Sequence, residues 1–357
     1  MDINNYSFPW LELIDCPAFC VKDGAIIAAN TPAEQRMLRV GTDIREIVTE
    51  NRDTYEAFKG GSLYLNIQVF DLPCPACVTR TQEYDIFHLH QDGNESILQA
   101  LALASVQLRM PLNNIMAVTD RLLPNMAQTN EGLQEEIGQI NQNLYRMLRV
   151  ICNMSDAASY QKNGTAGMQV ANLASVIDEI MEKAQALFAD SQVKLQYSGL
   201  YTKVFGLANT ERLERAIYNI LSNAANFSSN GSTVSAELSK SGNKLILTVR
   251  NKTAEDTSDR NFWQRYRREP SIEDPRHGLG LGMTLASAVA ALHGGTILVD
   301  HPALGETRVT MTIPIVKGNS DALHSPVLRI GDYAGGRDKG LLELVDFLPS
   351  DAYQNVN

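Results

Sequence analysis

The 357-residue sequence predicts a multidomain α+β protein, with a helical hairpin between a small α+β module and a larger α/β sandwich. Three observations lead to this prediction. Short strand-like runs fill residues 1–92, two heptad-patterned segments fill residues 93–162, and apolar helices alternate with strands over residues 163–317. Residues 318–357 form a C-terminal tail. The length is ample for domains with separate cores.

The chain is acidic, with 41 acidic and 31 basic residues and a formal net charge of −10. This balance argues against nucleic acid or an anionic membrane as a main partner. No apolar run reaches the roughly 18 to 20 residues that a membrane-spanning helix needs. Residues 1–5 also lack the basic start of a signal peptide. We therefore expect a cytoplasmic protein with no membrane or nucleic-acid partner.

The N-terminal part, residues 1–92, reads as short strands separated by turns such as Lys22-Asp23-Gly24. We expect a small α+β module, whose opening resembles a PAS sensor domain. The expected strands are Ala18–Val21, Ala25–Ala28, Leu63–Ile67, Val78–Thr81 and Tyr84–Leu89.

Four cysteines lie in this module, and two of them form the pair Cys74-Pro-Ala-Cys77. This spacing is typical of metal or redox sites, and with Cys16 and Cys20 four thiolates could bind zinc. Small buried cysteines are also common in protein cores. The sequence leaves both interpretations open.

Residues 93–162 show apolar positions in alternating steps of three and four, which predicts two helices joined by a polar loop at residues 124–130. Such a hairpin leaves its apolar seams half covered, and a second copy would complete a four-helix bundle. We therefore expect a homodimer, with packing against neighbouring domains as the alternative. The seam positions are Leu98, Leu101, Ser105, Leu108, Leu112, Ile115, Thr119 and Leu122, then Leu133, Ile137, Ile140, Leu144, Met147, Ile151, Met154 and Ala158.

Residues 163–317 predict a mixed sheet covered on one side by helices. A helix is expected over Leu173–Ala189, and alternating runs at Val234–Leu238 and Leu245–Val249 flank the turn Ser241-Gly-Asn243 as a hairpin. Val309, Met311 and Ile313 supply one face of a further strand. This pattern is typical of an α/β sandwich.

A further helix, Leu213–Phe227, has one apolar stripe and three asparagines, Asn219, Asn223 and Asn226, on the opposite side. Asparagine is a poor helix former, so a row of three requires an explanation. Amide oxygens beside a hard cation or a nucleotide would provide one. An ordinary polar outer face is the alternative.

About fifty residues later, Gly278, Gly280 and Gly282 precede an apolar helix that starts at Met283. Glycines allow backbone N–H groups to converge, so this loop and the helix N-terminus could bind phosphates. A flexible turn is the alternative.

Together, these two segments resemble the N box and the G2 box of sensor histidine kinases, which belong to the GHKL ATPase superfamily. Phe262–Arg267 resembles the F box, and Leu292–Val299 and Gly305–Pro314 resemble the last two strands. The resemblance implies bound ATP and Mg²⁺, with Asn223 as the Mg²⁺ ligand. It implies these nucleotide-binding residues: Asn219, Asn223, Asn226, Asn251, Gly278, Gly280, Gly282 and Thr284.

The chain departs from the family at its G1 box. Asn251 stands where the family has the aspartate that recognises adenine, and it keeps an oxygen acceptor. The glycines that follow in the family are replaced by Lys252, Thr253 and Ala254. Asn226 likewise stands where the family usually has a lysine near phosphate.

A second departure concerns the reacting group. Ser105–Leu112 resembles the H-box of the dimerisation domain, including the proline that locally breaks the first helix. Val106 and Gln107 occupy the positions of the phosphate-accepting histidine and its acidic neighbour. Residues 96–160 contain no histidine, so we expect no phosphohistidine at the usual place.

Three functions follow from the sequence. The first is a histidine-kinase-like signalling protein that dimerises and binds ATP without phosphorylating itself. The second is an active kinase that phosphorylates a partner protein in trans, and the third is a nucleotide-free dimeric scaffold. The possible partners are a response regulator or a partner histidine kinase. In the tail, Leu341–Leu348 predicts a short amphipathic helix that ends before Pro349 and either docks on the body or binds a partner.

Overall fold

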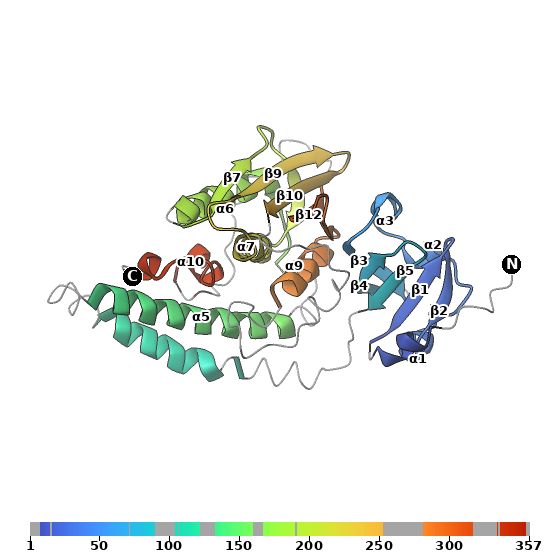
Figure 1. The fold of residues 1–357 in the computed structure, drawn as a ribbon, viewed down its shortest axis with the longest axis horizontal. Coiled ribbons are helices and arrows are strands. Elements are labelled where there is room, and N and C mark those ends of the chain that lie inside the picture. The colour runs from blue at the N-terminus through green and yellow to red at the C-terminus, as the bar shows by residue number, and fades with distance from the viewer. Residues whose placement is uncertain are drawn as a thin grey trace.

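The computed structural model describes residues 8–14, 16–70, 72–89, 104–105, 107–121, 133–159, 167–189, 191–252, 281–316, 334 and 336–354. Figure 1 shows the N-terminal module beside a helix-covered sheet. The hairpin and the C-terminal helices pack against the helices that cover this sheet. None of the helices in the described ranges is long and apolar enough to cross a bilayer.

The N-terminal module contains all five expected strands. They are β1 (Ala18–Lys22), β2 (Ala25–Ala29), β3 (Ser62–Val69), β4 (Leu72–Arg80) and β5 (Asp85–Leu89), in the order β2-β1-β5-β4-β3. The turn between β1 and β2 places Asp23 and Gly24 in the left-handed region, at φ 51° and 81°, as a tight hairpin turn requires. The helical elements are η1 (Pro9–Leu13), α1 (Thr31–Gln35), α2 (Ile44–Ile47) and α3 (Arg52–Ala57).

The cysteines of this module do not form a metal site in the described part of the chain. Strand alternation places Cys74 and Cys77 on opposite faces of β4. None of the five cysteines forms a disulfide, and no three potential metal ligands gather among the residues described. Burial raises the pKa of the Cys77 thiol to about 12. The core interpretation therefore describes these residues better than the zinc interpretation.

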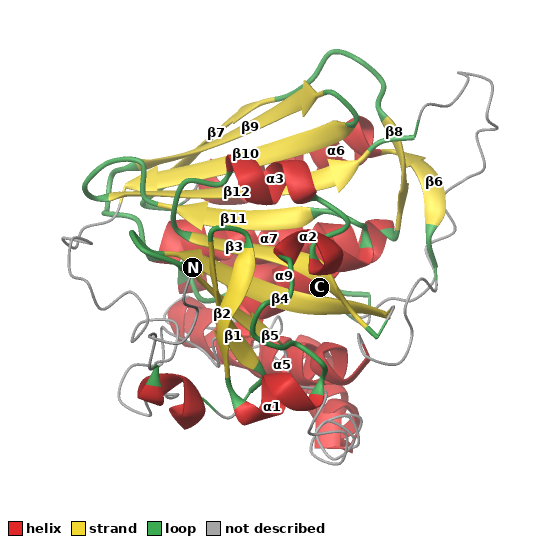
Figure 2. Ribbon diagram, turned by 90° about the vertical axis from the view of Figure 1, so that its right-hand side faces the viewer, coloured by secondary structure: helices red, strands yellow, loops and turns green. Residues whose placement is uncertain are grey.

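The sequence did not predict that the two sheets join. Strand β3 pairs with β11 (Thr296–Asp300), so the module and the sandwich share one ten-stranded sheet, visible in Figure 2. Gly61 permits the close approach, because its φ is 89° and an added Cβ would lie 2.2 Å from the Val299 carbonyl oxygen. The division of the chain into four domains stays a prediction.

The hairpin contributes a helix over residues 107–121 and α5 (Gln134–Ser159). The first helix runs through Pro111 without interruption, so the expected break there is wrong. Proline removes one backbone hydrogen bond, to the carbonyl four residues earlier. That carbonyl belongs to Gln107, an exposed residue where water can replace the lost bond. The loop between the helices lies outside the described residues.

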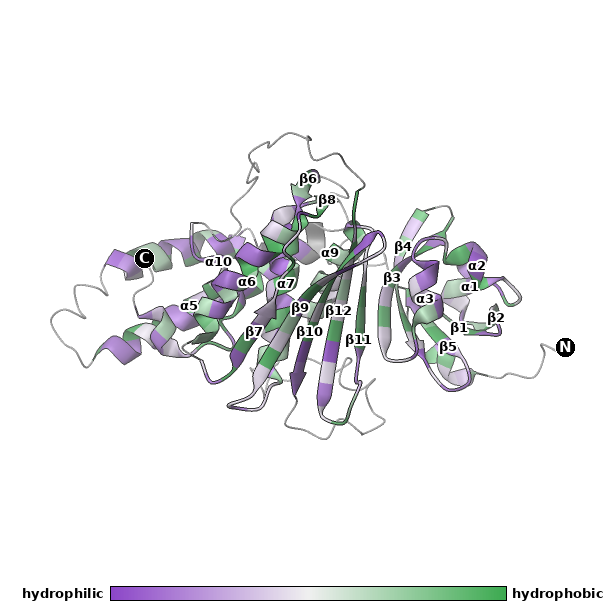
Figure 3. Ribbon diagram, turned by 90° about the horizontal axis from the view of Figure 1, so that it is seen from above, coloured by the Kyte–Doolittle hydropathy of each residue, from purple (hydrophilic) through white to green (hydrophobic). Residues whose placement is uncertain are grey.

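The sandwich has the expected two layers. Strands β7 (Lys194–Ser198), β9 (Thr233–Ser241), β10 (Lys244–Lys252), β12 (Glu306–Pro314) and β11 form the sheet, and β7 runs parallel to β9. Helices α6 (Leu173–Ala189), α7 (Thr210–Asn226) and α9 (Leu281–Leu292) share one core with the apolar side of the sheet. Figure 3 shows the alternation of hydrophobic and hydrophilic residues along these strands. A small second sheet pairs β6 (Gln169–Asn172) with β8 (Phe205–Ala208).

The C-terminal tail docks on this body. Its helix, α10, covers Lys339–Glu343 and is shorter and earlier than the expected Leu341–Leu348. The side chain of Asp338 caps it by accepting from the Leu341 N–H at 2.8 Å, which explains its earlier start. Pro349 precedes a second short element, η4 (Ser350–Tyr353). Six apolar side chains in the described part of the tail are buried: Ala334, Leu342, Leu344, Val345, Leu348 and Tyr353.

Candidate nucleotide site

The asparagine helix and the glycine helix lie against each other. Asn209 caps α7 by accepting from the Arg212 N–H at 3.1 Å, and an apolar stripe from Leu213 to Leu221 fixes the helix on the sheet. Gly282, at the start of α9, touches this helix, since an added Cβ would lie 2.8 Å from the Asn219 Oδ1 atom. The structure therefore brings together two segments that are about sixty residues apart.

Asn219 is buried rather than solvated. It is 2% exposed, and its Nδ2 donates to the Arg215 carbonyl at 3.0 Å. Its Oδ1 accepts from the Nη2 of Arg149, on α5, at 3.3 Å. The interpretation of this helix face as an ordinary solvent-exposed surface is therefore wrong at this position, because Arg149 of α5 and Gly282 of α9 lie against it.

The other two asparagines differ from Asn219 and from each other. Asn226 is exposed, and its Nδ2 donates to Ser222 Oγ at 3.4 Å. Asn223 is half-buried, and no hydrogen bond of its side chain occurs within the described part of the chain. Among the described residues, the amide oxygens of Asn223 and Asn226 thus have no partner to lose, whereas that of Asn219 is bound by Arg149. Asn223 is the more buried of the two.

Asn251 lies at the end of β10 on the apolar side of the sheet. It is 4% exposed, and its Nδ2 has no hydrogen-bond partner among the described residues. A buried amide without a partner costs about 1 to 3 kcal/mol. A ligand that accepts from Nδ2 and donates to Oδ1 would remove this cost, and the edge of an adenine ring has both kinds of group.

The remaining predicted site residues divide into two groups. Thr284 and Gln107 are described and exposed. Val106, Gly278, Gly280 and the F-box-like segment 262–267 lie outside the described residues. Their predicted roles therefore stay predictions.

A buried charge cluster next to α7 was not predicted. Arg215 on α7 donates from Nε to the fully buried Glu343 of α10 at 2.9 Å, and it also pairs with Asp156. Arg149 pairs with Asp346 at 2.6 Å, and its Nε lies 3.4 Å from Glu343. The sequence contained a sign of this cluster, because Glu343 interrupts an apolar run from Leu341 to Leu348 and would need a charged partner if buried.

His293 links the two helices of the site. The Asn209 N–H donates to its Nε2 at 3.1 Å, so Nδ1 carries the proton and donates to the Val289 carbonyl at 2.7 Å. Burial lowers the pKa of this histidine, because the charged form would lose its hydration. The neutral ring thus joins the C-terminus of α9 to the cap of α7, which is a structural role.

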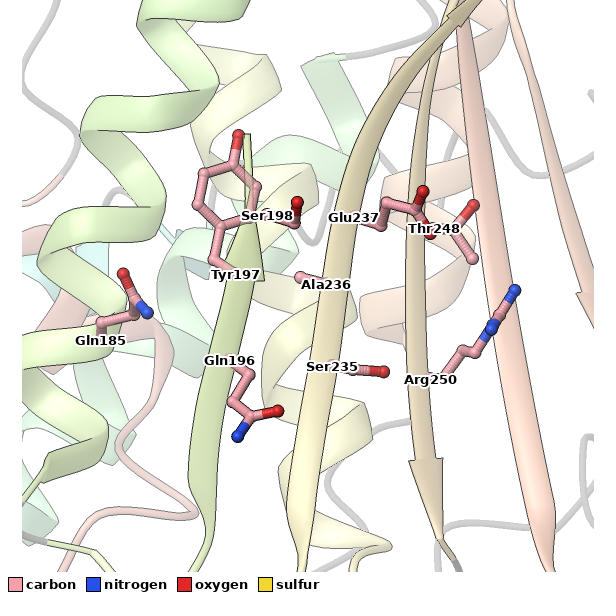
Figure 4. A pocket seen from close by; sticks show the side chains of 9 residues that line it. All are labelled: Gln185, Gln196, Tyr197, Ser198, Ser235, Ala236, Glu237, Thr248 and Arg250. Carbon is pink, nitrogen blue, oxygen red and sulfur yellow. The ribbon is translucent and has the colours of Figure 1, made fainter. Parts of the chain in front are cut away.

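The opposite face of the sheet carries an open polar hollow of roughly 580 Å³. Side chains from β7, β9 and β10 line it, including Glu237, Thr248 and Arg250 (Figure 4). Because side chains alternate along a strand, Arg250 faces this hollow while Asn251 faces the helices. The hollow is therefore separate from the candidate nucleotide site.

Comparison with known proteins identifies the sandwich. Residues 208–317 match the family described as histidine kinase-, DNA gyrase B-, and HSP90-like ATPase. This segment is a domain of that family. It contains α7, α9, Asn251 and the strands β9 to β12. The GHKL ATPase domain expected from the N box and the G2 box is thus confirmed.

The relatives of this chain are sensor histidine kinases. CusS of Escherichia coli K12 is 26% identical over 212 residues, which cover 58% of this chain and 43% of CusS. The circadian input-output histidine kinase CikA of Synechococcus elongatus is 26% identical over 304 residues, which cover 82% of this chain and 40% of CikA. This chain therefore spans less than half the length of these relatives. The structure of full-length ShkA in complex with AMPPNP aligns with 62% of this chain and 46% of that chain, at 19% identity and a TM-score of 0.46.

Proposed function

We propose that this chain is a cytoplasmic, histidine-kinase-like signalling protein that dimerises and binds ATP with Mg²⁺ but does not phosphorylate itself at the usual histidine position. The nucleotide-binding part of this proposal rests on the contact between the N-box-like and G2-box-like segments, where Asn219 lies against Gly282. The domain match to an ATPase family supports the same ligand.

The residues present fit an adenine nucleotide. The unpartnered amide of Asn251 can bind the adenine edge, and the N-terminus of α9 can face the phosphates. Asn223, whose amide oxygen has no partner among the described residues, can offer that oxygen to Mg²⁺. When bound, the nucleotide would supply the phosphoryl group, and the protein residues would hold and orient it.

The absence of self-phosphorylation rests on Val106 and Gln107. A valine side chain has no nucleophilic atom, and a neutral amide cannot take up the proton that a carboxylate would accept. Gln107 is exposed on its helix, where a phosphate acceptor would need to be accessible.

Exposed apolar residues on the hairpin support a dimer. Leu108 and Ile115 on the first helix, and Ile140 and Met147 on α5, are each about half exposed, between 46% and 53%. Within each pair the residues are seven positions apart, so each pair lies along one stripe of its helix. Leu144, on the same predicted seam, is buried within the chain and is no probe of the dimer. A response regulator or a partner histidine kinase is the partner we propose for this hairpin.

A nucleotide-free scaffold is the second candidate. One observation favours it, because Arg149 already occupies the amide oxygen of Asn219. In this alternative the site is closed permanently, and the dimer only presents a surface to partners.

Isothermal titration with ATP and MgCl₂ separates the two candidates. We expect the wild-type chain to bind ATP, and Asn223→Ala to abolish the Mg²⁺-dependent part of the affinity. Asn230→Ala, at an exposed position beyond the end of α7, is the matched control and should bind like the wild type. Absence of ATP or ADP binding at millimolar concentration would leave the scaffold.

A further inference from the structure

The tail residues 336–354, here called the C-terminal segment, connect the hairpin to the ATPase domain. The segment lies outside the matched domain, which ends at residue 317. Two of its acidic side chains reach both partners, since Asp346 pairs with Arg149 on α5 and Glu343 pairs with Arg215 on α7. Lys339 adds a third contact, to Glu214 on α7 at 3.1 Å.

Uncharged contacts hold the segment along α5. Asn141 donates to the Tyr353 carbonyl at 2.9 Å, and Gln142 donates to the Leu348 carbonyl at 2.7 Å. The rings of Tyr145 and Tyr353 lie 5.2 Å apart in an edge-to-face arrangement. The segment thus fixes α5 in one position over the ATPase domain.

This position places a guanidinium at the nucleotide site. The Nη2 of Arg149 lies 3.3 Å from Asn219 Oδ1 and 3.3 Å from Ser222 Oγ. The same Oδ1 borders Gly282. A metal cation at this oxygen would meet the positive charge of Arg149, so the two compete for it. The carboxylates of the segment hold Arg149 in this place.

We propose that Arg149 is a positioning residue that closes the nucleotide site, and that the C-terminal segment is the latch that holds it on Asn219. This inference rests on the proposed binding of ATP. Opening of the latch withdraws Arg149 and frees the amide. Nucleotide binding and latch closure then oppose each other, so each must weaken the other by the same factor.

Gly138 allows the latch to be opened without a change in the nucleotide site. It lies on α5, three turns from Arg149, and an added Cβ would lie 2.5 Å from the backbone carbonyl oxygen of Ser350. Alanine favours a helix more than glycine does, so Gly138→Ala preserves α5 while it displaces the segment. The neighbouring exposed residue gives the matched control, Gln139→Ala.

The experiment uses the full chain and measures ATP affinity by titration and backbone exchange by hydrogen–deuterium exchange. Gly138→Ala should bind ATP at least about fivefold more tightly than the wild type or Gln139→Ala. Exchange in residues 336–354 should be faster in this variant. In the wild type, addition of ATP should also accelerate exchange in the segment, which a merely structural contact would not show.

The outcomes are distinct. The expected gain in ATP affinity would support the latch. ATP binding by Gly138→Ala without detectable binding by the wild type or Gln139→Ala would also support it. A released segment with ATP affinity unchanged within about twofold would overturn the latch and leave the proposed function intact. If the segment is released but neither the wild type nor any variant binds ATP, both the latch and the proposed ATP binding are overturned. If Gly138→Ala does not fold, Asp346→Asn replaces it. This change removes the carboxylate that lies 2.6 Å from Arg149, at a partly exposed position. The same outcomes then support or overturn the latch.

Discussion

The N-terminal module and the C-terminal segment both attach to the ATPase domain, but they do so by different physical means. The module adds β3 to β11 through backbone hydrogen bonds, around the close approach of Gly61 to Val299. The segment attaches through side chains, with Glu343 and Asp346 on two arginines. A backbone ladder is insensitive to single charges, whereas a buried ion cluster depends on each of its members. Removal of a single charge should therefore loosen the C-terminal segment but leave the N-terminal module attached.

The largest effect is expected from Glu343→Ala. This change leaves Arg215 and Arg149 with fewer partners in a buried setting. We expect the free energy of unfolding to fall by about 3 kcal/mol or more. Urea unfolding followed by circular dichroism measures it. A loss below about 1 kcal/mol would show that water or other residues compensate readily.

The corresponding test of the module is Gly61→Ala. The new Cβ would meet the Val299 carbonyl, and the positive φ would be strained, so we expect a loss of about 2 kcal/mol. Gly60→Ala is the control, because no atom lies within 4 Å of its added Cβ. Equal melting temperatures for the two variants would contradict the proposed role of the β3–β11 contact.

A pH effect is expected from His293. Its pKa is lowered in the folded protein by burial, so below pH about 6.5 the unfolded chain takes up a proton that the folded chain does not. Stability is therefore complete above the unfolded pKa and declines as the pH falls toward the folded pKa. Melting temperatures at pH 7.5 and 5.5 should differ more for the wild type than for His293→Gln. Equal differences would assign the pH dependence to other groups.

The smallest effect is expected from Asp53→Asn, which removes the carboxylate that pairs with Lys244 at 3.1 Å. The Asp53 side chain is 76% exposed, so we expect a change below about 1 kcal/mol. Thermal unfolding in low and high salt measures it. A change as large as that of Gly61→Ala would mean that charge, rather than the backbone ladder, holds the module.

Local patterns predicted the elements well. Alternation located β9 and β10 around Ser241–Asn243, and the apolar period gave the bounds of α6 as observed. The sequence also located Asn251 at the end of β10, and the structure adds that it is buried. These features depend on residues that are close in the sequence, where periodicity is informative.

The sequence could not predict contacts between distant segments. The joining of β3 and β11 depends on residues more than two hundred positions apart. The heptad pattern likewise could not say which stripe turns inward, and Leu144 is buried while Met147 is half exposed. The burial of Asn219 likewise involves residues distant in the sequence, since Arg149 on α5 and Gly282 on α9 lie against its amide oxygen.

The central claim is that this chain has the ATPase domain of a histidine kinase without its phosphate acceptor. Incubation of the full chain with labelled ATP tests it most directly. The account predicts no acid-labile phosphate on the wild type, because Val106 cannot be phosphorylated, and labelling of the double variant Val106→His with Gln107→Glu. Acid-labile label on the wild-type protein would contradict the account.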